Sequence, residues 1–303
     1  MQISPLKNIC VSVIMITYNH EKFLKQAIEG VLMQQCSFDI ELIIANDCSP
    51  DNTDLIVQDI INNHPNGSWI NYITRKKNIG GQLNFINAFE RCQGKYIAHC
   101  EGDDFWTDSH KLQKQVEFLE SEPEYVLCFH KVNILKPDGQ LVEDYLTQVP
   151  ENYENIETLA RLGNYIHTPS VVYRNIIKKL PFELTFSPIG DFFLYMMLAQ
   201  HGKLKYFEEN MCVYRYGVGI FSSSSKLSMA KSNLNLFTFL LSYFKDENIN
   251  KIILERHLNG LIYFENLIRK EYSEAFVSDH LFFKFLKKVK KFYLKCAKKL
   301  KIK

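Results

Sequence analysis

Three carboxylates lie within four residues in the segment Glu101-Gly102-Asp103-Asp104, directly after an apolar run at 95–100. Carboxylates packed together repel one another, and their pKa values rise unless a cation is present. A hard divalent ion with oxygen ligands removes that cost, and magnesium sites commonly combine one or two carboxylates with substrate phosphates. We therefore interpret Asp103 and Asp104 as ligands of Mg²⁺ or Mn²⁺. The alternative interpretation is a solvated acidic turn.

Two further aspartates, Asp47 and Asp191, stand at the ends of predicted elements. Asp47 follows an apolar run at 40–45, and a carboxylate there can accept hydrogen bonds from a ribose or a base. Turn and helix-cap chemistry, shared with Asp51, explains the same position in a simpler way. Asp191 begins an apolar helical pattern, so it is either a helix cap or a general base held in an apolar rim.

A glycine pair marks a third candidate position. Asn78-Ile79-Gly80-Gly81 precedes a helical pattern, and backbone amides at a helix start can face an anionic ligand. A plain glycine turn is the alternative. The segment is not the GxGxxG pattern, and the phosphate-binding lysine loop of P-loop proteins is absent from the sequence.

The elements around these residues predict how they come together. Short β-branched apolar runs alternate with apolar residues at helical spacing through the first hundred residues, which predicts a parallel sheet covered by helices on both faces. Ligands bind such sheets at the carboxyl ends of the strands. Three polar segments directly follow strands and should converge there: Thr17-Tyr18-Asn19, Asn46-Asp47 and 101–104. The expected strands are 10–17, 40–45, 69–74 and 95–100.

The rest of the chain predicts a mixed continuation and then helices alone. A composition shift at the four serines 222–225 suggests a boundary, so we predict an α/β domain at 1–225 and a C-terminal helical region at 226–303. Before the boundary we expect helices at 108–120, 154–162 and 192–200, a hairpin at 125–135 and 141–145, a strand at 170–173, and edge strands at 204–207 and 211–214. After it we expect helices at 227–244, 250–269 and 280–300.

The last segment of the chain is strongly basic. Residues 281–303 carry ten lysines and no acid, while apolar residues recur at helical spacing. A basic amphipathic helix suits an anionic membrane surface, and the alternative is a core helix with a solvated lysine face. The net charge of the whole chain is only +2, which argues against a nucleic-acid partner.

Composition also bears on location. The first apolar run is too short for a secretory signal, and no run reaches the ~18 apolar residues of a spanning helix. The eight cysteines form no CxxC pair or zinc-like cluster, which favours reduced thiols. We therefore expect a cytoplasmic protein, associated with the inner face of the cell membrane through its last helix.

The motifs together resemble the family 2 inverting glycosyltransferases. Ile16-Thr17-Tyr18-Asn19 is similar to the family's opening strand and turn, and 46–51 is similar to its Asp-Asp-Gly-Ser-x-Asp pattern. Asn78-Ile79-Gly80 leads to Gly94-Lys95-Tyr96-Ile97-Ala98 and then to the acidic segment with the family's spacing. Segments 103–115 and 190–215 look like a bacterial subgroup that builds surface polysaccharides.

The resemblance implies a GT-A fold, which is a nucleotide-binding, Rossmann-like mixed sheet flanked by helices, here with a C-terminal helical extension. It implies a nucleotide-sugar donor, of the UDP-sugar type, and transfer of one hexose to a glycan or lipid-linked glycan acceptor. By position, the resemblance implies that Asp103 and Asp104 bind the metal and that Asp191 is the general base. Donor binding falls to Thr17, Tyr18, Asn19, Asp47, Asn78, Gly80 and Asp103.

Several positions depart from the family pattern: Glu101 replaces Asp, Asn46 replaces Asp, and Gly217 stands where relatives often have His. The main rival function is a GT-A domain that binds a nucleotide or a subunit without turnover. A nucleotidyltransferase would show a glycine-rich, lysine-containing loop, and a dinucleotide oxidoreductase would have glycines after the first strand, where Tyr18 and Asn19 stand. The Gln-x-x-Arg-Trp motif of processive relatives is missing, which favours single-sugar transfer.

Overall fold

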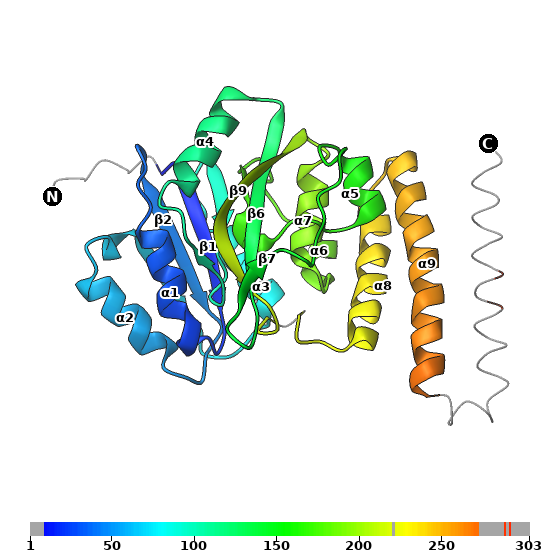
Figure 1. Cartoon of the computed structure of the whole chain (residues 1–303), viewed down its shortest axis with the longest axis horizontal. Coiled ribbons are helices and arrows are strands. Elements are labelled where there is room, and N and C mark those ends of the chain that lie inside the picture. Colours follow the sequence, from blue (N-terminus) through cyan, green and yellow to red (C-terminus); the bar gives the residue numbers. More distant parts are fainter. Residues whose placement is uncertain (1–8, 220–221, 273–287, 289–290, 292–303) are drawn as a thin grey trace. The chain divides into compact units, whose positions relative to one another are not determined.

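The computed structural model describes residues 9–219 and 222–272, together with the single positions 288 and 291. The internal contacts divide the chain into two units, Met1–Ser223 and Ser224–Lys303, and each is described by itself. All strands of the described residues belong to the first unit (Figure 1).

Nine strands in the described part of the chain form one mixed sheet. Its order is β3-β2-β1-β4-β8-β6-β9-β5, and β7 pairs with β6 outside this path. Strands β1 to β4 run parallel to one another, whereas β8 is antiparallel to both β4 and β6. The bounds are β1 Val11–Thr17, β2 Ile40–Asn46, β3 Ile70–Thr74, β4 Tyr96–His99, β5 Phe105–Trp106, β6 Tyr125–Leu135, β7 Leu141–Glu143, β8 Val172–Arg174 and β9 Lys203–Arg215.

Helices cover both faces of this sheet, as the alternating pattern predicts. Val11, Val13 and Met15 of β1 pack in one hydrophobic cluster with α1 and α4, while α3 contacts β1 and β2 without joining that cluster. The helices of the unit are α1 Glu21–Leu32, α2 Thr53–Asn63, α3 Gly81–Phe89, α4 Lys111–Ser121, α5 Ile156–Leu162, α6 Phe182–Phe186 and α7 Gly190–Leu198 (Figure 1). The predicted mixed α/β architecture flanked by helices is confirmed.

The prediction of two separate strands at 204–207 and 211–214 is wrong, because a single strand, β9, runs through both segments. Its first part pairs with β6 alone and lies at the sheet edge, as predicted, whereas Cys212 and Val213 lie between β6 and β5. The polar residues Glu208, Glu209 and Asn210 interrupt the apolar pattern between the two predicted strands. In the structure they lie where the register of the β6–β9 pairing shifts, on either side of Lys131. The short elements β5 and α6 were not predicted.

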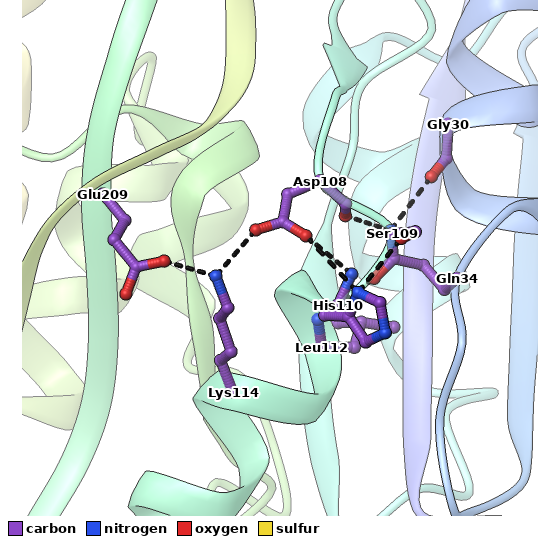
Figure 2. A network of polar contacts seen from close by, with 8 residues as sticks. All are labelled: Gly30, Gln34, Asp108, Ser109, His110, Leu112, Lys114 and Glu209. Carbon is purple, nitrogen blue, oxygen red and sulfur yellow. Dashed lines mark hydrogen bonds and ion pairs between the residues drawn. The ribbon is translucent and has the colours of Figure 1, made fainter.

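A polar network joins α1, the start of α4 and β9 (Figure 2). The Gln34 side chain donates to the Asp108 carbonyl at 2.7 Å and accepts from the backbone N–H of Leu112 at 3.1 Å. The Asp108 carboxylate accepts from the backbone of His110 at 2.7 Å and from Lys114 at 2.9 Å, and Lys114 also pairs with Glu209. This network fixes the segment that directly follows the acidic residues 101–104.

The second unit contains α8 Lys226–Tyr243 and α9 Glu247–Glu271, which pack against each other. Ser225 caps α8 by accepting from the N–H of Ser228 at 3.2 Å, and Asp246 caps α9 in the same way at 2.9 Å. The predicted basic helix at 280–300 lies outside the described residues. Among those described, no helix combines the length and hydropathy that a bilayer crossing requires.

Candidate active site

The carboxyl ends of the parallel strands β1, β2 and β4 lie next to one another. Backbone hydrogen bonds continue from these strands into the segments that follow them. Beyond the end of β1, the N–H of Asp47 donates to the Thr17 carbonyl at 3.0 Å. On the other side of β1, the N–H of Gly102 donates to the Ile16 carbonyl at 3.1 Å. The predicted polar segments after β1, β2 and β4 therefore lie side by side.

The acidic segment forms a compact cluster of oxygen ligands. Glu101, Asp103 and Asp104 each offer a carboxylate oxygen, and the three oxygens lie within 4.8 Å of one another. Asp103 is 7% exposed and Asp104 is 2% exposed, so both side chains point into the protein instead of into solvent. Glu101, which was not predicted as a ligand, belongs to the same cluster.

Burial makes this cluster electrostatically expensive without a cation. Burial raises the pKa of Glu101 to about 8, and the neighbouring charges of Asp103 and Asp191 add to the effect. Burial, followed by the charges of Asp103 and Glu101, also raises the pKa of Asp104 well above its ordinary value. A divalent cation would stabilise the ionised carboxylates.

The donor set fits a hard divalent cation. All three groups are carboxylates, the ligand type that Mg²⁺ and Mn²⁺ prefer. Asp104 Oδ1 accepts a hydrogen bond from the backbone N–H of Arg215 at 2.8 Å, which fixes the carboxylate. Asp104 Oδ2 is buried and has no hydrogen-bond partner among the described residues. That free oxygen leaves a coordination position open, and a lone buried acceptor otherwise costs free energy.

Gly102 brings two polar side chains against the cluster. A Cβ at this position would lie 2.8 Å from Thr17 Oγ1 and 2.9 Å from His20 Nδ1, so only glycine fits. Both of these atoms are buried, and neither has a partner in the part of the chain that the structure describes. They offer hydrogen bonds to a ligand beside the carboxylates. Thr17 was a predicted site residue, whereas His20 was missed, although it follows a strand tip.

Asp47 is buried at 2% exposure and ties the tip of β2 to the loop before α3. Its carboxylate accepts from the backbone N–H groups of Ile79 and Gly80, both at 2.8 Å. The Asn78 side chain accepts from the same Gly80 N–H at 2.9 Å, and Gly80 has a φ of 89°. The predicted residues Asp47, Asn78 and Gly80 therefore form one local unit.

The turn after β1 is held against the turn after β2. Asn19, with a φ of 61°, donates from its backbone to Ser49 Oγ at 3.0 Å. Ser49 is in turn bonded by Asn46, whose Oδ1 accepts from Ser49 Oγ at 2.6 Å and whose Nδ2 donates to the Tyr72 hydroxyl at 2.9 Å. Asn46 thus uses an amide donor that the family's usual Asp lacks. Tyr18, between these turns, is 46% exposed.

Asp191 lies in the first turn of α7 and is half-buried. Its Oδ2 accepts from Asn164 Nδ2 at 3.0 Å and from Thr168 Oγ1 at 3.4 Å. Burial raises the pKa of Asp191 despite these hydrogen bonds, which favour the charged form. Its charge also raises the pKa of Glu101, so Asp191 lies near the acidic cluster.

Arg215 completes the site and was not predicted as a site residue. Its guanidinium lies between the rings of Phe23 and Phe105, 4.8 Å from each centroid, and donates to Gln26. Arg215 Nε is buried and lacks a partner among the described residues. The following segment lies against the cluster, because a Cβ at Gly219 would be 3.3 Å from Asp103 Oδ2. A positive charge beside the carboxylates suits a phosphate.

Comparison with known sequences gives the family. The family model described as glycosyl transferase family 2 matches residues 12–196. An uncharacterized protein of Mycobacterium tuberculosis is 34% identical over 215 residues, which cover 71% of this chain and 61% of that protein. The minor teichoic acid biosynthesis protein GgaB of Bacillus subtilis is 26% identical over 251 residues, or 81% of this chain and 27% of that protein. The chain thus spans about 61% of the length of its mycobacterial relatives.

Comparison with solved structures gives the fold. Mannosyltransferase PcManGT from Pyrobaculum calidifontis, in complex with GDP-Man and Mn²⁺, matches with a TM-score of 0.62 at 14% identity, covering 95% of this chain and 85% of that one. S. aureus TarS in complex with UDP-GlcNAc matches with a TM-score of 0.59 at 17% identity, covering 84% and 73%. These likenesses show the GT-A fold. Since the family model spans more than half of the sequence, the chain belongs to glycosyl transferase family 2.

Proposed function

We propose that this protein transfers a single sugar from a nucleoside-diphosphate sugar to an acceptor hydroxyl, with inversion at the anomeric carbon. One observation carries the proposal. A cluster of three carboxylates, with buried Asp103 and Asp104 and a free oxygen on Asp104, lies within electrostatic range of a separate carboxylate, Asp191. The cluster can hold a cation and its phosphates, and the separate carboxylate can take a proton.

Asp103 and Asp104 would hold Mg²⁺ or Mn²⁺, with Glu101 in the same cluster. Such an ion would supply positive charge against the charge that develops on the leaving diphosphate. Arg215 and His20 would add hydrogen bonds to the phosphates, because Arg215 Nε and His20 Nδ1 are buried without partners among the described residues. Such fixed donors stabilise the leaving group without reorganisation. The Mn²⁺ in the PcManGT complex supports this assignment by analogy of fold.

The nucleoside would bind over the tips of β1 and β2. There Thr17, Tyr18 and Asn19 from one turn lie next to the unit formed by Asp47, Asn78 and Gly80. Exposed Tyr18 offers a ring face to a base, and Asp47 keeps lone pairs beyond its two backbone hydrogen bonds. We take a UDP-sugar as the donor class, which the UDP-GlcNAc complex of TarS supports.

Asp191 would act as the general base that removes the proton of the attacking hydroxyl. A base is efficient when its pKa is moved toward the working pH, and burial moves the pKa of Asp191 in that direction. Asn164 and Thr168 hold one of its oxygens, which orients the other toward an acceptor. Attack from the face opposite the diphosphate gives inversion in a single displacement.

The acceptor would be a glycan or a lipid-linked glycan of the bacterial surface, and nucleic acid is not a proposed partner. The name of the relative GgaB, a minor teichoic acid biosynthesis protein, supports a surface polymer as the product. A lipid-linked acceptor agrees with the predicted basic helix at 280–300, which would contact the anionic inner face of the cell membrane. We therefore propose that the protein works in the cytoplasm, next to that membrane.

A non-catalytic nucleotide-binding scaffold is the alternative, and hydrolysis separates the two. The purified protein is incubated with UDP- and GDP-sugars in the presence of Mn²⁺ or of EDTA, and release of the nucleoside diphosphate is measured. We expect slow, Mn²⁺-dependent hydrolysis of one donor, because water can replace the acceptor. Nucleotide binding without any metal-dependent hydrolysis or transfer to a glycan would favour the scaffold.

A further inference from the structure

An exposed tyrosine, Tyr145, and a half-buried one, Tyr216, lie in contact beside the site, and the proposed chemistry does not use them. Tyr145 follows β7 and is 55% exposed, and its ring centroid lies 6.3 Å from that of Tyr216 at an interplanar angle of 66°. Tyr216 directly follows Arg215, whose backbone bonds Asp104. Single exposed aromatic residues are common on protein surfaces, so a function for this pair must rest on how it is held and where it lies.

Tyr145 is held by an anchored segment. The preceding residue, Asp144, accepts hydrogen bonds from the N–H groups of Leu146 at 2.8 Å and Thr147 at 3.2 Å. Its other oxygen accepts from Thr147 Oγ1 at 2.5 Å and pairs with His167 Nε2 at 2.9 Å. The Asp144 and His167 side chains are only 12% and 10% exposed. A buried, fully bonded carboxylate fixes the backbone on which an exposed ring is displayed, so little ordering entropy remains to be lost on binding.

The same anchor connects the tyrosines to the proposed base. His167 precedes Thr168, whose hydroxyl bonds Asp191. The His167 ring lies 5.0 Å from the ring of Tyr214, one residue before Arg215. Tyr145 is thus linked to the proposed base through Asp144, His167 and Thr168, and Tyr216 adjoins Arg215, which bonds the acidic cluster. In the sheet order, three strands, β1, β4 and β8, separate β6 of this hairpin from β2, where the nucleoside would bind.

We propose that Tyr145 and Tyr216 form a subsite for the pyranose ring of a carbohydrate acceptor. The C–H bonds on one face of a pyranose carry partial positive charge and pack well on the negative face of an aromatic ring. The Lys136 ammonium lies over one face of the Tyr145 ring, 5.5 Å from its centroid, and can donate to the hydroxyls of a sugar that packs on the other face. This inference rests on the proposed function, because it names the acceptor of that same site.

Saturation-transfer NMR tests the subsite directly. UDP and Mg²⁺ are added in excess to the full chain. The methyl glycosides of glucose, galactose, mannose and N-acetylglucosamine are then added as test ligands. We expect at least one glycoside to receive saturation, and the signal to fall by about fivefold in Tyr145→Ala. Tyr145→Phe, which keeps the ring, and Leu146→Ala, which changes the adjacent exposed side chain, should retain it. Absence of signal for all four glycosides, or an undiminished signal in Tyr145→Ala, would overturn the subsite.

Mg²⁺-dependent UDP binding is measured on the same samples. It distinguishes a failure of the subsite from a failure of the proposed function. Retained UDP binding in Tyr145→Ala shows that the variant is folded, so its loss of glycoside signal supports the subsite. Wild-type protein that binds UDP with Mg²⁺ but no glycoside contradicts the subsite alone. Wild-type protein that binds no nucleoside diphosphate contradicts the proposed function itself.

Discussion

The backbone N–H of Arg215 donates a hydrogen bond to Oδ1 of Asp104 at 2.8 Å. These residues are far apart in the sequence, and the bond fixes the acidic segment to the end of β9. The Arg215 guanidinium, between Phe23 and Phe105, extends this link to α1. One oxygen of Asp104 is thereby occupied by structure, and the other remains available for a ligand.

Asp191→Asn tests the proposed base. The amide keeps the size of the side chain but cannot accept a proton, so we expect kcat to fall by ~10²–10⁴-fold. Donor affinity, measured by calorimetry, should stay within about twofold, because Asp191 bonds Asn164 and Thr168 and not the donor site. Asp59→Asn, an exposed residue on α2, serves as the control. Loss of donor binding with intact transfer would reverse the assignment.

Gly102→Ala tests the contact between the acidic segment and the tip of β1. The new methyl group would lie 2.8 Å from Thr17 Oγ1 and 2.9 Å from His20 Nδ1, so one segment must move. We expect a loss of about 1–3 kcal/mol in the free energy of unfolding, together with weakened nucleotide binding. Denaturant unfolding and calorimetry measure the two effects. Gly81→Ala, which meets nothing within 4 Å, should not destabilise the fold.

The effect of a divalent cation on stability should depend on pH. Burial, with the charges of Asp103 and Asp191, raises the pKa of Glu101 from 4.5 to about 8. Without metal, this raised pKa gives stability that is present below the unfolded value and is lost as pH rises through the folded value. Bound Mg²⁺ favours the ionised form, so the increase in Tm on adding Mg²⁺ should be larger above about pH 8 than at about pH 6. Thermal unfolding at both pH values measures this, and an equal increase at both would contradict it.

Gln34→Leu tests the polar network of Figure 2, which fixes the segment directly after the acidic residues 101–104. The substitution leaves the Asp108 carbonyl and the Leu112 N–H without their side-chain partner in a buried place. We expect a cost of about 1–3 kcal/mol for unfolding in urea. Gln113→Leu, in the first turn of α4, changes a half-buried side chain that accepts from the Ser37 backbone, and it should cost less. Equal stability of Gln34→Leu and wild type would show that the network is not needed.

Strands β1, β2 and β4 could be predicted from the sequence because buried parallel strands are continuous apolar runs, whereas the third predicted strand, β3, is only partly buried. The prediction 40–45 differs from β2, Ile40–Asn46, by one residue, and the later hairpin strand 125–135 matches β6. Strand β9 could not be predicted as one element, since its polar middle is tolerated only where the register shifts beside Lys131. The two-residue β5 is fixed by pairing with β9, which is a tertiary effect.

The candidate site was predictable where chemistry follows a strand directly. Asp103, Asp104 and Asp47 each stand at such a position. Arg215 and His20 were not predicted, because their roles depend on contacts between distant segments: Arg215 on Asp104, and His20 on the missing Cβ of Gly102. The link from Asn164 and Thr168 to Asp191 likewise has no sequence signature.

Calorimetric titration of UDP tests the central claim most directly. It is performed on wild type and Asp104→Asn, each with Mg²⁺ and with EDTA. The substitution keeps Oδ1, which accepts from Arg215, and replaces the free Oδ2 with an amide that cannot hold a cation. The account predicts tight UDP binding only for wild type with Mg²⁺. Equal UDP affinity in EDTA, or in Asp104→Asn with Mg²⁺, would contradict it.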